Sequence, residues 1–305
     1  MTLDPQVAAW VARTLGASPH EVFFEARSMS EVWGVELVDG RRVAIKRRGD
    51  DGRLAIVAAA HRAADAAGID TPALLAGPDP VDGDQRLTAE AWRPEGRTRP
   101  PRSPQDLYAR LSAQIIAAVG DVNAAGLEPP PWMHYDHADP DRVWPPAASS
   151  RWDPHRIEAD LPPSLVRLGG AARARLLAAD LPRVLGHADL NGQNVRWVGE
   201  RPIVHDWDSI AVLPEAVHVG NLAADHVATL EQGAIADIES CAALLAAYER
   251  EAGRSFTADE TEVAWATTVW LGCYNAAFEH LHGAPGACTA MILADGDARL
   301  ALAGA

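Results

Sequence analysis

Apolar and polar residues alternate along the first part of the chain, as they do in half-buried strands. The alternation covers residues 21–48 on both sides of an Asp39-Gly40 turn, and the second strand ends at Lys46. This pattern is typical of consecutive antiparallel strands. Residues 53–67 are rich in alanine with helical spacing, and residues 86–92 are strand-like again. Strands, a helix and further strands predict a small α+β unit.

The pattern changes after residues 98–104, which are rich in proline and arginine and which we interpret as a linker. Beyond them, apolar residues recur at helical spacing with few β-branched runs. These helical stretches are residues 105–125, 163–180, 232–252 and 259–282. The sequence therefore predicts an α+β protein of two lobes, in which residues 1–96 form a small antiparallel-sheet lobe and residues 97–305 a mainly helical lobe.

One long irregular segment, residues 128–152, interrupts the helical part. It is rich in proline and contains Trp132, Trp144 and Trp152. Irregular segments of this length inside compact domains are often functional. Either this segment covers or lines a binding site, or it is a packed excursion at the surface.

Composition excludes several classes of protein. The 305 residues are 48% apolar and 23% charged, which is typical of a globular protein. No apolar run reaches the roughly 20 residues that a bilayer requires. The first residues predict an amphipathic helix with an early acid rather than a secretory signal, so we expect no membrane association and a cytoplasmic location. The three cysteines form no CxxC pair, which argues against a disulfide framework or a zinc ribbon.

The formal net charge of −15 argues against a nucleic-acid partner, because affinity for phosphate backbones comes largely from clustered Lys and Arg. An acidic surface keeps a protein soluble, and it could also attract a cationic small molecule. Asp225, Glu231 and Glu279 could recognise ammonium groups, and Trp270 or Tyr274 could supply aromatic faces. The alternative is that each is an ordinary helix residue.

The residues with the clearest chemical pattern lie between positions 187 and 206. The pattern starts with His187-x-Asp189, continues with Asn194 five residues after that acid, and ends with Asp206 twelve residues later. Two short strand-like stretches joined by a Gly-Glu turn lie between Asn194 and Asp206. Such a hairpin would bring these two side chains close together at adjacent strand ends.

Phosphoryl transfer needs this set of side chains. Magnesium prefers hard oxygen ligands, and the negative oxygens of a triphosphate must be neutralised while the acceptor hydroxyl is oriented. Asn194 and Asp206 would bind magnesium, and Asp189 would accept or orient the hydroxyl proton. His187 would be a buried strut. Asp208 follows on the same side of an extended segment, and it is either a further metal ligand or a structural carboxylate.

These residues resemble those of the aminoglycoside phosphotransferase and choline kinase group. The catalytic loop of that group has the pattern H-x-D-x-x-x-x-N followed by a segment like I-D-W-x-x-A, and the matching text here is HADLNGQN and VHDWDSI. The resemblance implies a protein-kinase-like fold of two lobes. It also implies ATP as the donor, with GTP as a possible substitute, together with Mg²⁺ and a small-molecule acceptor.

Lys46 gives separate support. It is the only lysine among 27 basic residues, so this chain uses arginine wherever a plain positive charge suffices. It stands at the end of a strand, where the kinase-like fold places the lysine that holds the α and β phosphates. A compact ammonium and a planar guanidinium are not equivalent between phosphate oxygens.

The resemblance implies further contacts to the nucleotide. The family's phosphate-covering loop corresponds to the segment that holds Ser28 and Ser30, which has no glycine but could donate hydrogen bonds from its serines. The position at which the family's backbone meets adenine corresponds to the segment that holds Glu90 and Trp92. Core packing is the alternative for Trp92.

One departure leaves the orientation of Lys46 open. The family pairs this lysine with a glutamate on the following helix, whereas residues 54–60 read LAIVAAA and the nearest acid on that helix is Asp65. Together with the glycine-free loop, this departure makes a nucleotide-binding pseudokinase an alternative. A metal-dependent hydrolase is another, and its metal ligands would be His187, Asp189, His205, Asp206 and Asp208. A protein kinase is disfavoured, because Asp-Phe-Gly and Ala-Pro-Glu are absent after Asp206.

Overall fold

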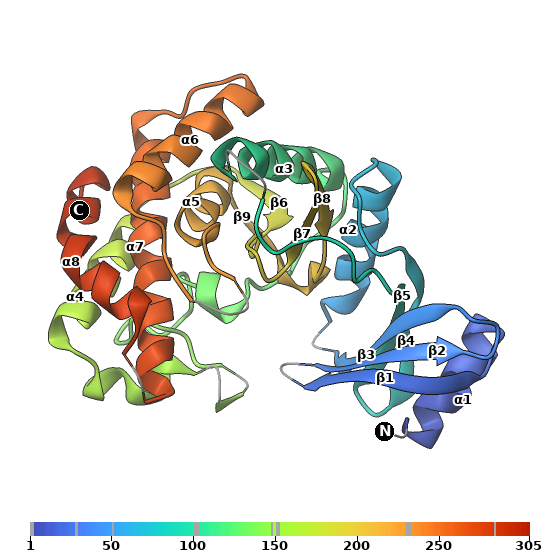
Figure 1. Ribbon diagram of the computed structural model, residues 1–305. Coiled ribbons are helices and arrows are strands. Elements are labelled where there is room, and N and C mark those ends of the chain that lie inside the picture. Colours follow the sequence, from blue (N-terminus) through green and yellow to red (C-terminus); the bar gives the residue numbers. More distant parts are fainter. Residues whose placement is uncertain are drawn as a thin grey trace. The chain divides into compact units, whose positions relative to one another are not determined.

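Two units make up the chain in the computed structural model (Figure 1). One consists of Met1–Glu95 together with Ile203–Asp208, and the other of Gly96–Pro202 together with Ser209–Ala305. The second piece of the first unit, Ile203–Asp208, lies within residues 97–305, which the sequence analysis assigned to the helical lobe. The structure describes residues 3–27, 30–50, 52–100, 104–147, 149–150, 153–229, 233–283 and 285–305.

An antiparallel sheet of five strands forms the first unit, in the order β1-β2-β3-β5-β4. The strands are β1 (Pro19–Arg27), β2 (Glu31–Leu37), β3 (Arg42–Gly49), β4 (Leu74–Asp82) and β5 (Gln85–Ala91). The predicted turn joins β2 to β3: Gly40 has a φ of 83°, and Asp39 Oδ1 accepts a hydrogen bond of 3.1 Å from the backbone N–H of Arg41. Such a carboxylate bond is a common way to close a tight turn.

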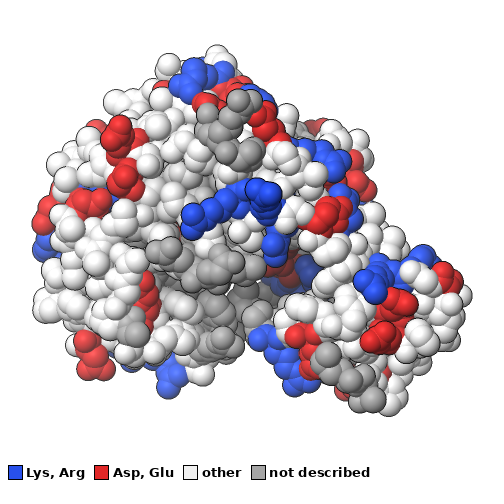
Figure 2. Space-filling view, in the orientation of Figure 1, with Lys and Arg blue, Asp and Glu red and all other residues white. Residues whose placement is uncertain are grey.

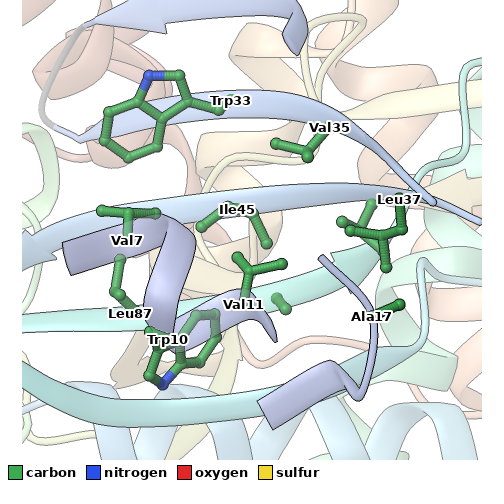
Figure 3. Packing of buried hydrophobic residues seen from close by; sticks show 11 residues of the cluster. Val7, Trp10, Val11, Ala17, Trp33, Val35, Leu37, Ile45 and Leu87 are labelled. Carbon is green, nitrogen blue, oxygen red and sulfur yellow. The ribbon is translucent and has the colours of Figure 1, made fainter. Parts of the chain in front are cut away.

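Helix α1 (Pro5–Leu15) packs on one face of this sheet (Figure 3). Asp4 caps its first turn by accepting from the backbone N–H of Gln6 at 2.8 Å, and Gly16 ends it in the left-handed conformation. Side chains of α1, β2, β3 and β5 form a single apolar cluster. Its members are Val7, Trp10, Val11, Ala17, Trp33, Val35, Leu37, Val43, Ile45, Leu87 and Ala89.

The opposite face of the sheet carries the polar residues of the same strands. Because side chains alternate along a strand, the burial of Val43 and Ile45 against α1 directs Ala44 and Lys46 to the other face. Helix α2 (Leu54–Ala66) lies on that other side, where it lines a small cavity of about 20 Å³ together with side chains of β3, β4 and β5.

The second unit is mainly helical. Its helices are α3 (Pro104–Val119), α4 (Pro163–Leu177), α5 (Glu215–Asp225), α6 (Ile238–Ala252), α7 (Ala258–Leu281) and α8 (Ala287–Leu302). Helix α7 is buried along most of its length and starts with a capping box between Thr257 and Glu260. Strands β6 (Arg183–His187) and β9 (Ile210–Pro214) pair antiparallel. Strands β7 (Val195–Val198) and β8 (Arg201–Val204) form the hairpin that the sequence predicted.

The observed elements confirm the predicted fold class, a small antiparallel sheet followed by a mainly helical part, and they correct some details. Helices α5 and α8 were not predicted, and the helix expected over residues 232–252 begins at Ile238. Lys46 lies inside the third strand, β3, rather than at the end of the second strand. The described part of the irregular segment contains the short 3₁₀ turn η1 (Pro131–Met133), and the 3₁₀ turn η3 (Pro154–Asp160) follows the segment. Both acidic and basic side chains are spread over the face in Figure 2. Within the described ranges, every helix is too short or too polar to cross a bilayer.

Candidate functional site

Asp189 lies in the loop between β6 and β7, and two asparagine side chains hold its carboxylate. Asn191 Nδ2 donates to Oδ1 at 2.8 Å, and Asn194 Nδ2 donates to Oδ2 at 2.6 Å. Asn194 Nδ2 also donates to the backbone oxygen of Asp189 at 3.0 Å. Each carboxylate oxygen therefore accepts a hydrogen bond from an asparagine amide. A carboxylate oxygen can accept more than one such bond.

His187 holds the start of this loop, as the sequence analysis proposed for it. Its ring is buried at the end of β6, and Nδ1 accepts a hydrogen bond of 3.2 Å from the backbone N–H of Asp189. That bond occupies the ring nitrogen nearest to the acid. The histidine thus stabilises the turn on which the carboxylate stands.

The carbonyl of Ala188 connects the loop to the surrounding helices. It accepts from Asn221 Nδ2 on α5 at 2.9 Å and from Trp132 Nε1 at 3.1 Å. The backbone oxygen of Trp132 in turn accepts from Trp270 Nε1 on α7 at 2.7 Å. The irregular segment therefore supports the loop that carries Asp189, and Trp270 is part of the buried framework rather than an exposed aromatic face.

Asp225 also contacts this loop. Its carboxylate accepts a short hydrogen bond from Asn191, whose side-chain oxygen accepts from the backbone N–H of Gln193 at 2.8 Å. Burial raises the pKa of Asp225 to about 6. Glu279 serves a different purpose: it caps the start of α8 by accepting from the backbone N–H groups of Gly286 and Thr289. Neither acid is placed as a free ammonium receptor, and Glu231, the third acid considered for this role, lies outside the described residues.

In the first unit, Lys46 lies between two carboxylates. Its Nζ is 3.2 Å from Glu90 Oε1 on β5 and 3.5 Å from Asp206 Oδ1. Burial by itself would lower the pKa of Lys46, but the charges of Glu90, Asp206 and Asp208 outweigh it and raise that pKa, so the ammonium stays charged. Burial raises the pKa of Glu90, and the attraction of Lys46 opposes that shift.

Asp206 has a special backbone conformation. Its φ of 56° makes it the one residue other than glycine with a positive φ in the described part of the chain. Aspartate tolerates this region better than most residues, and such conformations concentrate at functional sites. Its side chain is 44% exposed, so the carboxylate can reach a ligand as well as Lys46.

The neighbours of Asp206 anchor it in the first unit. Trp207 Nε1 donates to Thr71 Oγ1 at 2.8 Å, and Thr71 Oγ1 donates to the backbone oxygen of Val204 at 2.8 Å. The ring of His61 on α2 stacks on Trp207 with centroids 5.4 Å apart. These contacts explain why the short segment Ile203–Asp208 belongs to the first unit.

Asp208 is engaged by arginines. Its carboxylate forms an ion pair with Arg48, and its backbone oxygen accepts from Arg53 Nη2 at 2.9 Å. Of the two roles that the sequence left open, this arrangement favours the structural carboxylate over the metal ligand. The arginines were not anticipated, because nothing in their sequence positions points to residue 208.

The other residues expected to contact the nucleotide are the two serines before β2 and the residues at and after the end of β5. Ser28 lies outside the described residues, and Ser30 is partly exposed directly before β2. Trp92 packs edge-on against Phe23 with centroids 5.0 Å apart, and it also contacts Phe24. The Trp92 ring therefore packs against other aromatic side chains, which was the alternative to an adenine contact. The Glu90 side chain, which was grouped with the adenine site, points to Lys46.

Comparison with known proteins identifies the fold. Neither protein-family models nor curated sequences give a match. Solved structures do match over nearly the whole chain. An aminoglycoside phosphotransferase from Alicyclobacillus acidocaldarius has a TM-score of 0.59 at 15% identity, and the match covers 100% of this chain and 95% of that one. The chain has the fold of these small-molecule kinases.

Two further kinase structures support this assignment. A choline/ethanolamine kinase family protein from Mesorhizobium loti has a TM-score of 0.54 at 17% identity, with 98% of this chain and 92% of that chain covered. The amicoumacin kinase hAmiN, solved with AMP-PNP, Ca²⁺ and Ami, has a TM-score of 0.60 at 13% identity, with 98% and 91% covered. The resemblance inferred from the two motifs is thus confirmed at the level of the kinase fold.

Sequence reasoning did not assign several contacts of the candidate site. Asn191, Asn221 and Trp132 hold the Asp189 loop. Glu90 was assigned to the adenine contact, whereas its side chain pairs with Lys46. A signal for Glu90 was available in the sequence, because it is the only acid in the strand-like stretch of residues 86–92. Asn221 and Trp132 are distant in sequence, so only the folded chain reveals them.

The buried Asp225 predicts a dependence of stability on pH. Its folded pKa of about 6 lies above its ordinary value of 3.8, so between these values the folded chain holds a proton that the unfolded chain has lost. This stabilisation is complete below pH 3.8 and is lost as the pH rises through 6. Asp225→Asn cannot titrate, so we expect its stability relative to the wild type to increase between pH 4 and 7, by at most about 3 kcal/mol.

Urea denaturation of both proteins across this pH range measures the difference. The side chain of Asp225→Asn retains an oxygen that can accept from Asn191, so the loop contact is preserved in the comparison. Parallel stability curves for the two proteins would show that Asp225 does not bind the extra proton.

Proposed function

We propose that this chain is a small-molecule kinase, which moves the γ-phosphoryl group of ATP to a hydroxyl group. The observation that carries the proposal is the pair of Asn191 and Asn194 amides on the Asp189 carboxylate. These bonds orient a carboxylate in a partly exposed loop, as a group that takes a proton from a hydroxyl requires. The Lys46 ammonium and the Asp206 carboxylate supply the charges that a metal-bound triphosphate needs.

The residues fit a magnesium-bound nucleotide. Asn194 uses its amide nitrogen for Asp189, which leaves the carbonyl oxygen Oδ1 as the atom to bind a metal. Asp206 offers a partly exposed carboxylate, so both ligands are hard oxygen donors of the kind that Mg²⁺ prefers. Magnesium, when bound, would neutralise charge on the phosphate oxygens during transfer. AMP-PNP in the hAmiN structure supports ATP as the donor.

The chain's own side chains would act as follows. Lys46 binds oxygens of the α and β phosphates, and Asn194 and Asp206 hold the metal. Asp189 accepts the proton of the acceptor hydroxyl through one of its carboxylate oxygens. The hydroxyl oxygen forms a bond to the γ phosphorus while the bond from that phosphorus to the β–γ bridging oxygen breaks, so the products are a phosphate ester and ADP. The amides on Asp189 keep the carboxylate in place as it gains the proton.

We propose a cationic small molecule as the acceptor. The net charge of −15 favours the approach of a cation. Relatives of the same fold named for aminoglycosides, choline or ethanolamine, and amicoumacin support a small molecule rather than a polymer as the acceptor.

Each of the two alternatives from the sequence loses one of its supports. The pseudokinase alternative rested on the lack of a helix acid for Lys46 and on the glycine-free loop, and Glu90 supplies an acid from β5. The hydrolase alternative counted His187 among its metal ligands, whereas Nδ1 of His187 accepts a hydrogen bond from the backbone N–H of Asp189.

Nucleotide binding is the first expected property. ATP with Mg²⁺ at about 100 times its dissociation constant should stabilise the chain by roughly 2.7 kcal/mol, and thermal unfolding reports this as a higher midpoint. Asp206→Asn should reduce the part of this stabilisation that depends on magnesium, because asparagine tolerates the left-handed backbone conformation but lacks the negative charge. Asp65→Asn, which changes an exposed acid on α2, should behave like the wild type. Equal shifts for all three proteins would contradict a role of Asp206 at the metal.

Phosphoryl transfer depends on Asp189. With an acceptor found by following ADP release over a panel of cationic alcohols and antibiotics, Asp189→Asn should lower kcat by about 100-fold or more, because the positioned base is lost. The same variant should keep the stabilisation by ATP and Mg²⁺. Full activity of Asp189→Asn would refute the proposed reaction.

A further inference from the structure

We propose that Glu90 is the residue that positions Lys46 for the nucleotide, in place of an acid on helix α2. This inference rests on the proposed function, because it assumes that Lys46 binds phosphate oxygens. Glu90 is a positioning residue in this account: its carboxylate contacts the lysine, and the lysine contacts the nucleotide. Lys46 Nζ is 3.2 Å from Glu90 Oε1, closer than the 3.5 Å to Asp206 Oδ1.

The sheet itself brings the two side chains together. Strands β3 and β5 are antiparallel neighbours in which Lys46 pairs with Thr88 and Ala44 pairs with Glu90. Glu90 is therefore the diagonal neighbour of Lys46 on the same face, within reach of two long side chains. Leu87 and Ala89 occupy the other face, in the core with α1. The register of the backbone ladder fixes the ion pair.

Helix α2 cannot provide the same contact from its native residues. Its buried positions are Leu54, Val57, Ala58, Ala60, His61 and Ala64, none of them acidic. Asp65, the acid that the sequence suggested, is exposed. Ala58 and His61 line the small cavity that Glu90 also lines, so α2 meets the acid from β5 without contributing one.

Burial makes the pair persistent. The side chains of Lys46 and Glu90 are 12% and 11% exposed, so water screens their attraction little. Separating them would leave an uncompensated buried charge, which is strongly unfavourable. The contact to Asp206 is longer, and Asp206 itself is 44% exposed. A triphosphate can therefore replace Asp206 at the ammonium, freeing that carboxylate for the metal, while Glu90 stays in place.

The inference has a functional consequence. A lysine whose partner lies on a helix is oriented only while that helix is docked. Here both partners belong to adjacent strands of one sheet, so the orientation of Lys46 is set when the sheet forms. We infer that the nucleotide site of this chain is organised without an adjustable helix contact.

A double-mutant cycle tests the positioning role. The variants are Lys46→Met, Glu90→Gln and their combination, with Thr88→Val as the matched control on the same face of β5. Calorimetric titration gives the Kd of each for ATP with Mg²⁺ and for adenosine, which has no phosphates. Glu90→Gln should weaken ATP binding about tenfold or more, and leave adenosine binding as in Thr88→Val. The double variant should bind ATP no more weakly than Lys46→Met, because Glu90 acts through the lysine.

Other outcomes would overturn the inference. Glu90→Gln could bind ATP like the control, it could lose adenosine to the same extent, or the losses could add in the double variant. If Glu90→Gln does not fold, the comparison of Lys46→Met with the double variant still tests the inference, because the double variant leaves neither buried charge unpaired. Equal affinities of these two variants for ATP would support the inference. Weaker ATP binding by the double variant would refute it. Failure of the wild type to bind ATP with Mg²⁺ would instead refute the proposed function, and this inference with it.

Discussion

The alternation of side chains along β3 and β5 is the constraint on which the first unit depends. On one face of the sheet, Ile45 and Leu87 pack against α1 and form the core. On the other, Lys46 and Glu90 form a buried ion pair. A shift of register by one residue would exchange the faces and place the charges in the apolar core. The same apolar packing that stabilises the sheet therefore also holds the only lysine of the chain in a defined direction.

The second unit orients its acid by a different means. Asp189 stands in a loop between short strands, where no extended ladder fixes the side chain, and amides take over that task. Asn191 and Asn194 each donate to one carboxylate oxygen, and Asn221 and Trp132 hold the preceding carbonyl. Both donors are neutral amides, so they orient the carboxylate without adding a positive charge of their own.

The fold class and the chemical identity of the main residues could be predicted from the sequence, and the partners of those residues could not. Alternation and helical spacing are local patterns, so the sheet and most helices were predictable, and the H-x-D-x-x-x-x-N spacing identified Asp189 and Asn194. The pairing of Lys46 with Glu90 depends on the register of two strands separated by a helix and another strand. The sequence left Asp208 open between a metal ligand and a structural carboxylate, because its ion-pair partner Arg48 is 160 residues away in the sequence. Helix α5 was missed although it carries Asn221, a residue whose role exists only beside the folded loop.

A structure of the chain with AMP-PNP and Mg²⁺ tests the central claim most directly. The account predicts oxygens of the α and β phosphates within hydrogen-bond distance of Lys46 Nζ, with Glu90 still on the lysine and the metal bound by Asn194 Oδ1 and Asp206. A nucleotide bound elsewhere, or a metal that contacts neither Asn194 nor Asp206, would contradict it.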